Sequence, residues 1–521
     1  MKESQPQTET NDKGLLKSSG VVSLMTLFSR VLGLVRDMVI ANFFGAGSSA
    51  DTFFLAFRIP NFFRRLFGEG AFSQAFVPVL SEYRNRDNPA EIRDLISSVS
   101  GSLGFCLVAI SVVGVLAAPV IIAVFAAGYV YGGEIEKLAL ASEMLRITFP
   151  YVLLICMTAL AGAILNSYGK FAAPAFTPVL LNVSLILAAI YLSPLMDSPV
   201  VGLAWGVLIA GVVQLTFQLP FLARQRLLVQ PRIDFQHAGV KKVMTLMLPA
   251  LFGVSVGQIN LLLDTVLASF LETGSLSWLY YSDRLLELPL ALFGIAIATV
   301  VLPSLSMLKA DQSEEFSRTI DWALRMVCLF GIPASLALVV LSESLITTLF
   351  YQGEMTQRDV EMSALSLSAY GIGLLGHMFV KVLAPGYYAR QDMSTPVRYG
   401  IIALAANMVL NLLLVWNFKH AGLALATSLS AFLNAGLLFY GLRKKAAYIL
   451  QAGWLKLILQ LLAANGLMVT FLLYASPPQE VWFEMGFWVR LGIMLAVCGV
   501  GGIIYGLGLL MVGIRFKEWV R

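Results

Sequence analysis

The sequence predicts an all-α polytopic membrane protein with about fourteen transmembrane helices, and three observations lead to this fold class. The chain of 521 residues is 58% hydrophobic and only 13% charged, whereas soluble domains are about 45–50% apolar and about 25% charged. Its mean hydropathy is +0.79. Apolar segments of spanning length recur along the whole chain, and such a chain cannot cover its apolar surface with polar residues in water.

The first half of the chain contains six apolar segments. Residues 1–19 are polar and lack the apolar core of a signal peptide, which predicts an uncleaved cytoplasmic tail. A spanning helix needs about 20 mostly apolar residues. The segments that satisfy this condition form a predicted N-lobe over 20–222, and they are 20–43, 50–80, 95–126, 139–166, 174–194 and 199–222. Several are longer than a simple span, which predicts tilts, kinks or short turns outside the membrane.

The second half repeats this organisation and then adds two helices. A basic cytoplasmic linker, 223–242, leads to a predicted C-lobe over 243–441. Its six segments are 243–271, 277–307, 319–349, 363–388, 399–416 and 421–441. A second basic linker, 442–454, precedes the last two segments, 455–475 and 487–513, and residues 514–521 form a C-terminal cytoplasmic tail.

The basic residues between the segments are distributed asymmetrically. Most lie in the termini and in alternate connections, whereas the other connections hold only Lys137, Arg358 and Lys419. Because Lys and Arg mark cytoplasmic loops, both termini are predicted to be cytoplasmic. This distribution also explains the net charge of +5, so we expect no binding of nucleic acid.

An internal repeat relates the two predicted lobes. ANFFGAGS at 41–48 resembles ASFLETGS at 268–275, and Gly-Leu-Ala at 202–204 recurs at 422–424. Each half has an even number of helices, so both halves insert the same way up. The sequence therefore predicts a parallel repeat, with two six-helix lobes around a central cavity, and the last two helices fall outside it.

Ionisable residues inside the apolar segments are concentrated in the first, second and eighth of them. The set comprises Arg30, Arg36, Asp51, Arg58, Arg64, Arg65, Glu69, Asp283, Arg284 and Glu287. A charge at the bilayer centre costs about 2.5–3.5 kcal/mol, so the cluster indicates function. Guanidinium groups bind phosphate bidentately and keep their charge, so the excess of arginine predicts a hydrated cavity for a phosphorylated substrate. The alternative is a network of buried ion pairs that fixes helix packing.

A second polar set lies in the C-terminal half. Asp264, Asn407, Asn411 and Thr427 offer hard oxygen ligands and one negative charge, which suits a sodium ion. Two alternatives stay open, namely a cluster of interhelical hydrogen bonds and an ion pair between Asp264 and Lys381. The four cysteines and three histidines form no metal-binding pattern.

Known catalytic and nucleotide-binding motifs are missing from the sequence. It contains no Walker A loop, no H-E-x-x-H, no nucleophile elbow and no dinucleotide fingerprint. We therefore expect no catalytic residues and no cofactor other than Na⁺. An ATP-driven pump is excluded, and a gradient or the membrane potential must supply the energy of any transport.

Four stretches of the sequence resemble one protein family. They are FSRVLGLVRD, FFGAGSSADTFFLAFRIPNFFRRLFGEGAFSQAFVPVLSEY, WLYYSDRLLELPLALFGIAIATVVLPSLS and VLAPGYYARQDMSTPV. They are similar to the MurJ (MviN) lipid II flippases of bacteria, within the multidrug/oligosaccharidyl-lipid/polysaccharide exporter superfamily. The resemblance runs over nearly the whole chain from about residue 17.

The resemblance implies a transporter, not an enzyme, in the bacterial cytoplasmic (inner) membrane. Its substrate would be lipid II, the peptidoglycan precursor linked to undecaprenyl diphosphate, moved to the periplasmic leaflet by alternating access. The substrate-binding residues that it implies are Arg30, Arg36, Asp51, Asn61, Arg64, Ser277, Asp283, Arg284 and Glu287. Residues 455–513 would form a groove for the lipid tail, and the oxygen set around Asp264 fits a sodium site of some members.

We expect a monomer that contacts membrane lipid and proteins of cell-wall synthesis. Two other functions remain open from the residues. A related exporter would move another polyprenyl-linked glycan, or a cationic drug, although the arginine excess argues against the drug. A scaffold for cell-wall assembly would not transport at all, and its cavity charges could be neutralised without loss of function.

Overall fold

The computed structural model describes residues 9–66, 72–308, 312–444 and 448–514, and these residues form helices and connections with no β-strand. This confirms the all-α prediction. Residues 1–8 and 515–521 of the predicted tails lie outside the described residues. The chain divides into two compact units: the first comprises Met1–Phe43 and Ser48–Phe270, and the second Phe44–Gly47 and Leu271–Arg521.

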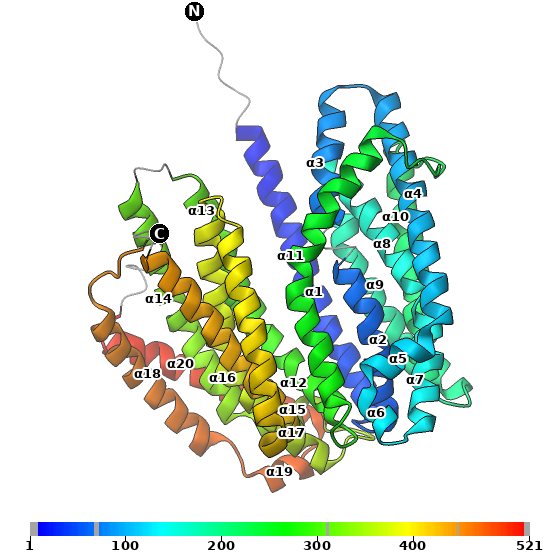
Figure 1. Cartoon of the computed structure of the whole chain (residues 1–521). Helices are drawn as coiled ribbons and strands as arrows, with labels where there is room; N and C mark the ends of the chain where they lie inside the picture. The colour runs from blue at the N-terminus through cyan, green and yellow to red at the C-terminus, as the bar shows by residue number, and fades with distance from the viewer. Residues whose placement is uncertain (1–8, 67–71, 309–311, 445–447, 515–521) are drawn as a thin grey trace, which may run out of the picture. The chain divides into compact units, whose positions relative to one another are not determined.

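The first unit contains the helices of the N-terminal half (Figure 1). They are α1 (Glu9–Phe44), α2 (Ser48–Phe63), α3 (Phe72–Asn85), α4 (Pro89–Leu116), α5 (Ala118–Phe125), α6 (Ala127–Tyr131), α7 (Ile135–Thr148), α8 (Tyr151–Ser167), α9 (Ala172–Leu187), η2 (Ala188–Leu192), η3 (Ser193–Leu195), α10 (Val201–Arg224) and α11 (Ala238–Ala268). Capping residues in the sequence determine where several of these helices begin. At α4, for example, the Asn88 side chain accepts a hydrogen bond from the Ala90 amide at 3.1 Å, and Pro89 occupies the first turn.

The second unit contains the helices of the C-terminal half. They are α12 (Ser275–Pro289), η4 (Leu290–Ile295), α13 (Ala296–Ser306), α14 (Ser313–Val340), α15 (Ser342–Phe350), α16 (Gln357–Tyr388), α17 (Ser394–Lys444), α18 (Trp454–Ala475), α19 (Gln479–Glu484) and α20 (Phe487–Met511). A capping box starts α16, in which Thr356 and Asp359 bond to each other's backbone amides. The α12 helix follows Gly274, whose φ of 101° is open to glycine at little cost.

Each predicted apolar segment overlaps helix in the described part of the chain, but the structure divides four of them between two separate α-helices, namely 50–80, 95–126, 139–166 and 319–349. Residues 67–71 of the first of these lie outside the described residues. Ten helices of the described residues are long and apolar enough to cross a membrane by length and composition, so the total of fourteen spans stays a prediction. The predicted break between 399–416 and 421–441 is confirmed as a kink in α17 at Lys419, where φ is 48°. The α11 helix, which the sequence assigns to the C-lobe, is grouped with the first unit, and the lobe boundaries also stay a prediction.

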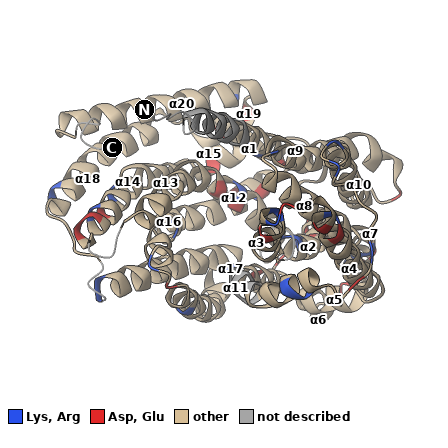
Figure 2. Cartoon of the chain, turned by 90° about the horizontal axis from the view of Figure 1, so that it is seen from above, with Lys and Arg blue, Asp and Glu red and all other residues tan. Residues whose placement is uncertain are grey.

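Apolar packing holds each unit together. In the first unit, the side chains of Phe76, Leu95 and Leu165 are buried in one cluster with their neighbours on α3, α4 and α8. In the second unit, α16 packs against α12, α14 and α17, and α18 packs against α20. Charged residues are few along α18 and α20, as the colouring in Figure 2 shows. Lys456 and Arg490 are the charged residues within these two helices.

The connection between α10 and α11 runs along the first half of α4. The Arg232 amide donates to the Ser97 carbonyl at 3.0 Å, and the Ser97 hydroxyl donates to the Gln230 carbonyl at 2.6 Å. Nearby, a hydrogen bond from the Lys242 ammonium lowers the pKa of Glu82, which lies at the end of α3. Small residues on α4 make this close approach possible, because a Cβ atom on Gly101 would lie 2.3 Å from the Arg232 carbonyl carbon.

Replacing Gly101 with alanine should therefore detach this connection from α4. A backbone clash cannot be relieved by a rotamer change, so we expect a loss of about 1–3 kcal/mol of unfolding free energy. Thermal unfolding of the purified protein in detergent would measure it. Gly104→Ala is the matched control, because its Cβ would meet only the Met157 sulfur, at 4.0 Å. Equal melting temperatures for the two variants would contradict the assigned contact.

Candidate functional site

In the first unit, α1 carries two of the predicted substrate-binding arginines in different surroundings. The Arg36 side chain is buried, and it donates to Asp37 Oδ1 from Nε at 2.9 Å and from Nη2 at 2.6 Å. Its Nη1 donates to Asn182 Oδ1 at 3.0 Å, and the Asn182 amide donates in turn to the Ser29 carbonyl at 3.0 Å. These bonds join α1 to α9 through a charged group inside the unit.

Arg36→Ala is expected to destabilise the protein. Breaking a buried ion pair by removing one partner costs about 3–5 kcal/mol, and the side chains of Arg36 and Asp37 are only 6% and 1% exposed. Thermal unfolding should show the loss. A double variant, Arg36→Met with Asp37→Leu, should recover most of it, because packed apolar residues replace buried ion pairs at little cost. A double variant as unstable as the single one would contradict this account.

Arg30 is partly exposed on α1. Among the residues that the structure describes, no hydrogen bond or ion pair is formed by its guanidinium group. Arg30 therefore carries a positive charge that no described residue of the first unit neutralises. This is the arrangement expected of a group that binds an anionic ligand.

The α2 helix brings further polar residues to the first unit. Asp51 is buried in its first turn, where a negative charge is favoured by the helix dipole. In the last turn of the helix, Asn61 Oδ1 accepts a hydrogen bond at 2.7 Å from Nε of Arg64, the residue that follows α2. Arg58 Nη1 donates to the Thr265 hydroxyl of α11 at 2.6 Å. Asn61 and Arg64 are both partly exposed.

In the second unit, α12 carries the remaining predicted substrate-binding residues. Arg284 Nη1 donates to Glu287 Oε2 at 2.9 Å, and Nη2 donates to the Tyr280 hydroxyl at 3.1 Å. The Arg284 and Glu287 side chains are 27% and 36% exposed, whereas Ser277 is buried. The guanidinium group also lies over the Tyr280 ring, 5.0 Å from its centroid. Helical spacing explains these contacts, because residues three and four apart share a face.

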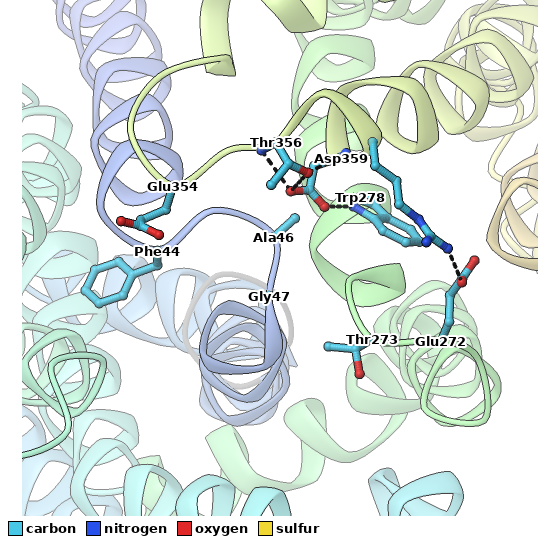
Figure 3. A pocket seen from close by; sticks show the side chains of 10 residues that line it. Phe44, Ala46, Gly47, Glu272, Thr273, Trp278, Glu354, Thr356 and Asp359 are labelled. Atoms are coloured by element: carbon cyan, nitrogen blue, oxygen red, sulfur yellow. Dashed lines mark hydrogen bonds and ion pairs between the residues drawn. The ribbon is translucent and has the colours of Figure 1, made fainter.

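A pocket of about 510 Å³ opens in the second unit near the start of α12 (Figure 3). Glu272 accepts hydrogen bonds from Arg358 at 2.7 Å and from Lys419 at 3.2 Å. Trp278 Nε1 donates to Asp359 Oδ1 at 2.9 Å, as Figure 3 shows. Glu272, in the connection before α12, is thus bonded to α16 and to the kink in α17. The predicted substrate-binding residues do not line it.

The predicted sodium ligands are divided between the units. Asp264 is buried on α11 of the first unit. In the second unit, Asn411 Nδ2 donates to Asn407 Oδ1 at 2.9 Å, and Asn407 Nδ2 lies 3.4 Å from the Thr427 hydroxyl. Lys381, the alternative partner of Asp264, is exposed on α16. The structure thus joins three of the four predicted ligands, and the complete site stays a prediction.

Three residues of these clusters escaped the sequence prediction, namely Asn182, Thr265 and Tyr280. A lone amide in the otherwise apolar segment 174–194 is a signal for Asn182, because a polar group in lipid needs a partner. Tyr280 lies four residues before Arg284, and this spacing was sufficient to predict their contact. The partly exposed guanidinium groups are those of Arg30 and Arg64 in the first unit and Arg284 in the second. In either unit, such a group can bind an anion, above all one with several oxygens.

Comparison with known proteins yields a consistent family. A family model described as "Lipid II flippase MurJ" matches residues 40–491. A protein of Vibrio cholerae described as "Probable lipid II flippase MurJ" is 52% identical over 515 residues, which cover 98% of each chain. The "Lipid II flippase MurJ" of Burkholderia cenocepacia is 44% identical over 455 residues, covering 86% of this chain and 88% of that one.

Solved structures agree with the sequence relatives. A structure described as "Lipid II flippase MurJ, inward closed conformation" superposes with a TM-score of 0.78 at 27% identity, covering 96% of this chain and 99% of that chain. An inward-facing multidrug transporter of the MATE family gives a TM-score of 0.67 at 14% identity, over 82% of this chain and 98% of the other. The second likeness concerns the fold alone.

Proposed function

The chain belongs to the lipid II flippase family MurJ, and from that premise we propose that it moves lipid II from the cytoplasmic to the periplasmic leaflet by alternating access. The observation that carries this proposal is the 52% identity, over nearly all of both chains, with a relative described as a probable lipid II flippase. The partly exposed arginines supply the chemistry, because the lipid II headgroup is attached through a diphosphate.

The proposed mechanism begins with the diphosphate. Arg30 and Arg64 of the first unit and Arg284 of the second bind its oxygens, and Arg36 holds α1 in register through Asp37 and Asn182. The headgroup then enters the cavity while the polyprenyl tail stays in the bilayer along α18 and α20. Binding drives the conformational change only if the diphosphate binds one conformation more tightly than the other.

Release of the substrate needs a counter-charge for the arginines. The hydrogen bond between Arg284 and Glu287 supports the view that acidic neighbours take over when the diphosphate leaves. Asp283 and Asp51 are proposed to do the same. The α12 helix thus carries both the positive charge that binds the diphosphate and the negative charge that restores the site.

Sodium is proposed to bind at Asp264, Asn407, Asn411 and Thr427. Amide, hydroxyl and carboxylate oxygens suit a hard cation, and the hydrogen bonds among the three residues of the second unit support a common site. Replacing NaCl by KCl in a transport assay should lower the rate. A rate that does not change would favour the pairing of Asp264 with Lys381.

Depletion of the protein in its own cells tests the proposed function. Lipid II should accumulate in the cytoplasmic leaflet and vanish from the periplasmic one, and the wild-type gene should restore it. Leaflet location can be read with a membrane-impermeant reagent that modifies the headgroup. If depletion changed cell-wall assembly but left the leaflet distribution of lipid II unchanged, the protein would be a scaffold or would move another polyprenyl-linked glycan.

A further inference from the structure

The last two spanning helices are attached to the rest of the second unit by polar contacts at three levels of α14 and α15. At one end, Asp321 of α14 holds the segment that precedes α18. Midway, the Tyr505 hydroxyl of α20 donates to the Leu329 carbonyl at 2.6 Å. At the other end, Arg490 Nη1 donates to the Thr347 carbonyl at 3.0 Å, and Gln479 Nε2 donates to the Thr347 hydroxyl at 2.6 Å.

Asp321 is the most heavily bonded of these attachment points. Its carboxylate is almost completely buried, with the residue 4% exposed. Oδ1 accepts from the Tyr448 hydroxyl at 2.7 Å and from Trp454 Nε1 at 2.8 Å, and the Gln451 amide lies 3.4 Å away. Oδ2 accepts from Arg325 Nε at 2.6 Å. One buried carboxylate therefore gathers donors from the connecting segment, from the first residue of α18 and from α14 itself.

Neighbouring residues on the same face of α14 extend the attachment. Ser317, one turn before Asp321, accepts from the Ile449 amide at 2.8 Å and donates to the Ile449 carbonyl at 2.9 Å. Arg325, one turn after it, donates from Nη2 to the Ala452 carbonyl at 2.7 Å and lies over the Trp454 ring. Residues spaced by four lie on one helical face, so these three side chains form a continuous strip along the 448–454 segment.

The direction of α18 is set immediately after this strip. Gly453 adopts a φ of 92° just before the helix, a conformation that glycine reaches without a steric penalty. Trp454, the next residue, is bonded to Asp321 through its indole. The residues on either side of Gly453 are bonded to α14, Ala452 to Arg325 and Trp454 to Asp321. The direction of α18 therefore depends on a turn that these two side chains of α14 fix.

We propose that Asp321 is a positioning residue for transport, because its carboxylate fixes the start of α18 and with it the α18–α20 surface along which the polyprenyl tail lies. This inference rests on the proposed function, which places the tail there. Both oxygens of the Asp321 carboxylate accept hydrogen bonds from Tyr448, Trp454 and Arg325. In this proposal the carboxylate does not contact the substrate. Loss of Asp321 should thus weaken binding of the polyprenyl tail along α18 and α20. Binding of the diphosphate headgroup should not change.

Transport of two substrates that differ only in tail length tests the proposal. Purified protein in proteoliposomes is given lipid II with its full-length tail or an analogue with a tail of four isoprene units, and an impermeant reagent reports arrival in the opposite leaflet. For Asp321→Ala we expect the full-length rate to fall at least about tenfold, since each hydrogen bond to a charged group is worth on the order of a tenfold factor. The short-tail rate should fall less than about twofold.

Further variants separate positioning from general damage. Asp321→Asn keeps an oxygen for Tyr448 and Trp454 and should recover much of the full-length rate. Glu314→Gln is the matched control, because Glu314 pairs with Arg318 on α14, outside the strip, and both side chains are exposed. It should leave both rates unchanged. Tyr448→Phe removes one donor with little change in volume and should lower the full-length rate selectively.

The outcomes are distinct. Equal losses for both tails in Asp321→Ala and in Tyr448→Phe would mean that Asp321 has only a structural role, and unchanged rates would show that the attachment is dispensable. A wild-type protein that moves neither substrate would overturn the proposed function itself, whatever the variants do.

Discussion

Replacing Arg30 with alanine should abolish transport while leaving the fold intact. Among the described residues, Arg30 forms no hydrogen bond or ion pair, so its truncation removes no attachment within the first unit. A bidentate contact with phosphate comprises two charge-assisted hydrogen bonds, each worth about 1.5–3 kcal/mol, so the rate should fall at least about a hundredfold. The measurement is rescue of depleted cells, scored by lipid II in the periplasmic leaflet.

Two comparisons make this result specific. Arg30→Lys keeps the charge but cannot form the planar bidentate contact, so it should restore transport only in part. Thermal unfolding of Arg30→Ala should match that of the wild type, in contrast to Arg36→Ala. If Arg30→Ala restored periplasmic lipid II at the wild-type rate, the first unit would bind the diphosphate elsewhere or not at all.

The second large effect is expected at Arg284. Arg284→Glu places two acids three residues apart on α12, where the structure has an ion pair of 2.9 Å, and it removes the guanidinium group that we propose binds the diphosphate in the second unit. Transport should fall by at least about a hundredfold, because an attractive contact with the diphosphate becomes a repulsive one. The same rescue assay measures it.

A charge swap distinguishes substrate binding from a structural ion pair. Arg284→Glu combined with Glu287→Arg rebuilds the pair with its order reversed. A purely structural pair would tolerate the reversal, so transport would return. If the guanidinium group must lie at position 284, next to Tyr280, the swapped protein remains inactive. Recovery of transport by the swap would contradict the proposed role of Arg284.

The helical plan was accessible from the sequence to within a few residues at most boundaries. The segment 363–388 corresponds to α16, which ends at Tyr388, and 455–475 corresponds to α18, which runs from Trp454 to Ala475. A long apolar run predicts a helix because every backbone polar group in lipid must find its hydrogen-bond partner within the helix. The short helices α6 and α19 were missed, since five or six residues carry too little periodicity to be recognised.

Identical residue types proved to have different surroundings within one helix. Arg30 and Arg36 were predicted as equals, yet the first is partly exposed and the second is buried against Asp37 and Asn182. Sequence spacing identifies partners one turn apart, as for Arg284 and Glu287. It does not identify Asn182, which lies 146 positions from Arg36 in the chain.

The sequence by itself determined the membrane class, the succession of helices and the helices that carry charge, because these follow from local composition and spacing. The family came from the resemblance of four stretches to known proteins. Only the tertiary structure decided which charges are used within the fold. Arg36, Glu272 and Asp321 bond to residues far along the chain, whereas Arg30 forms no such bond within the part of the chain that the structure describes. The reason is physical: the partner of a buried charge is set by which helix faces pack together, and packing brings distant residues within hydrogen-bonding distance without leaving a periodic trace in the sequence.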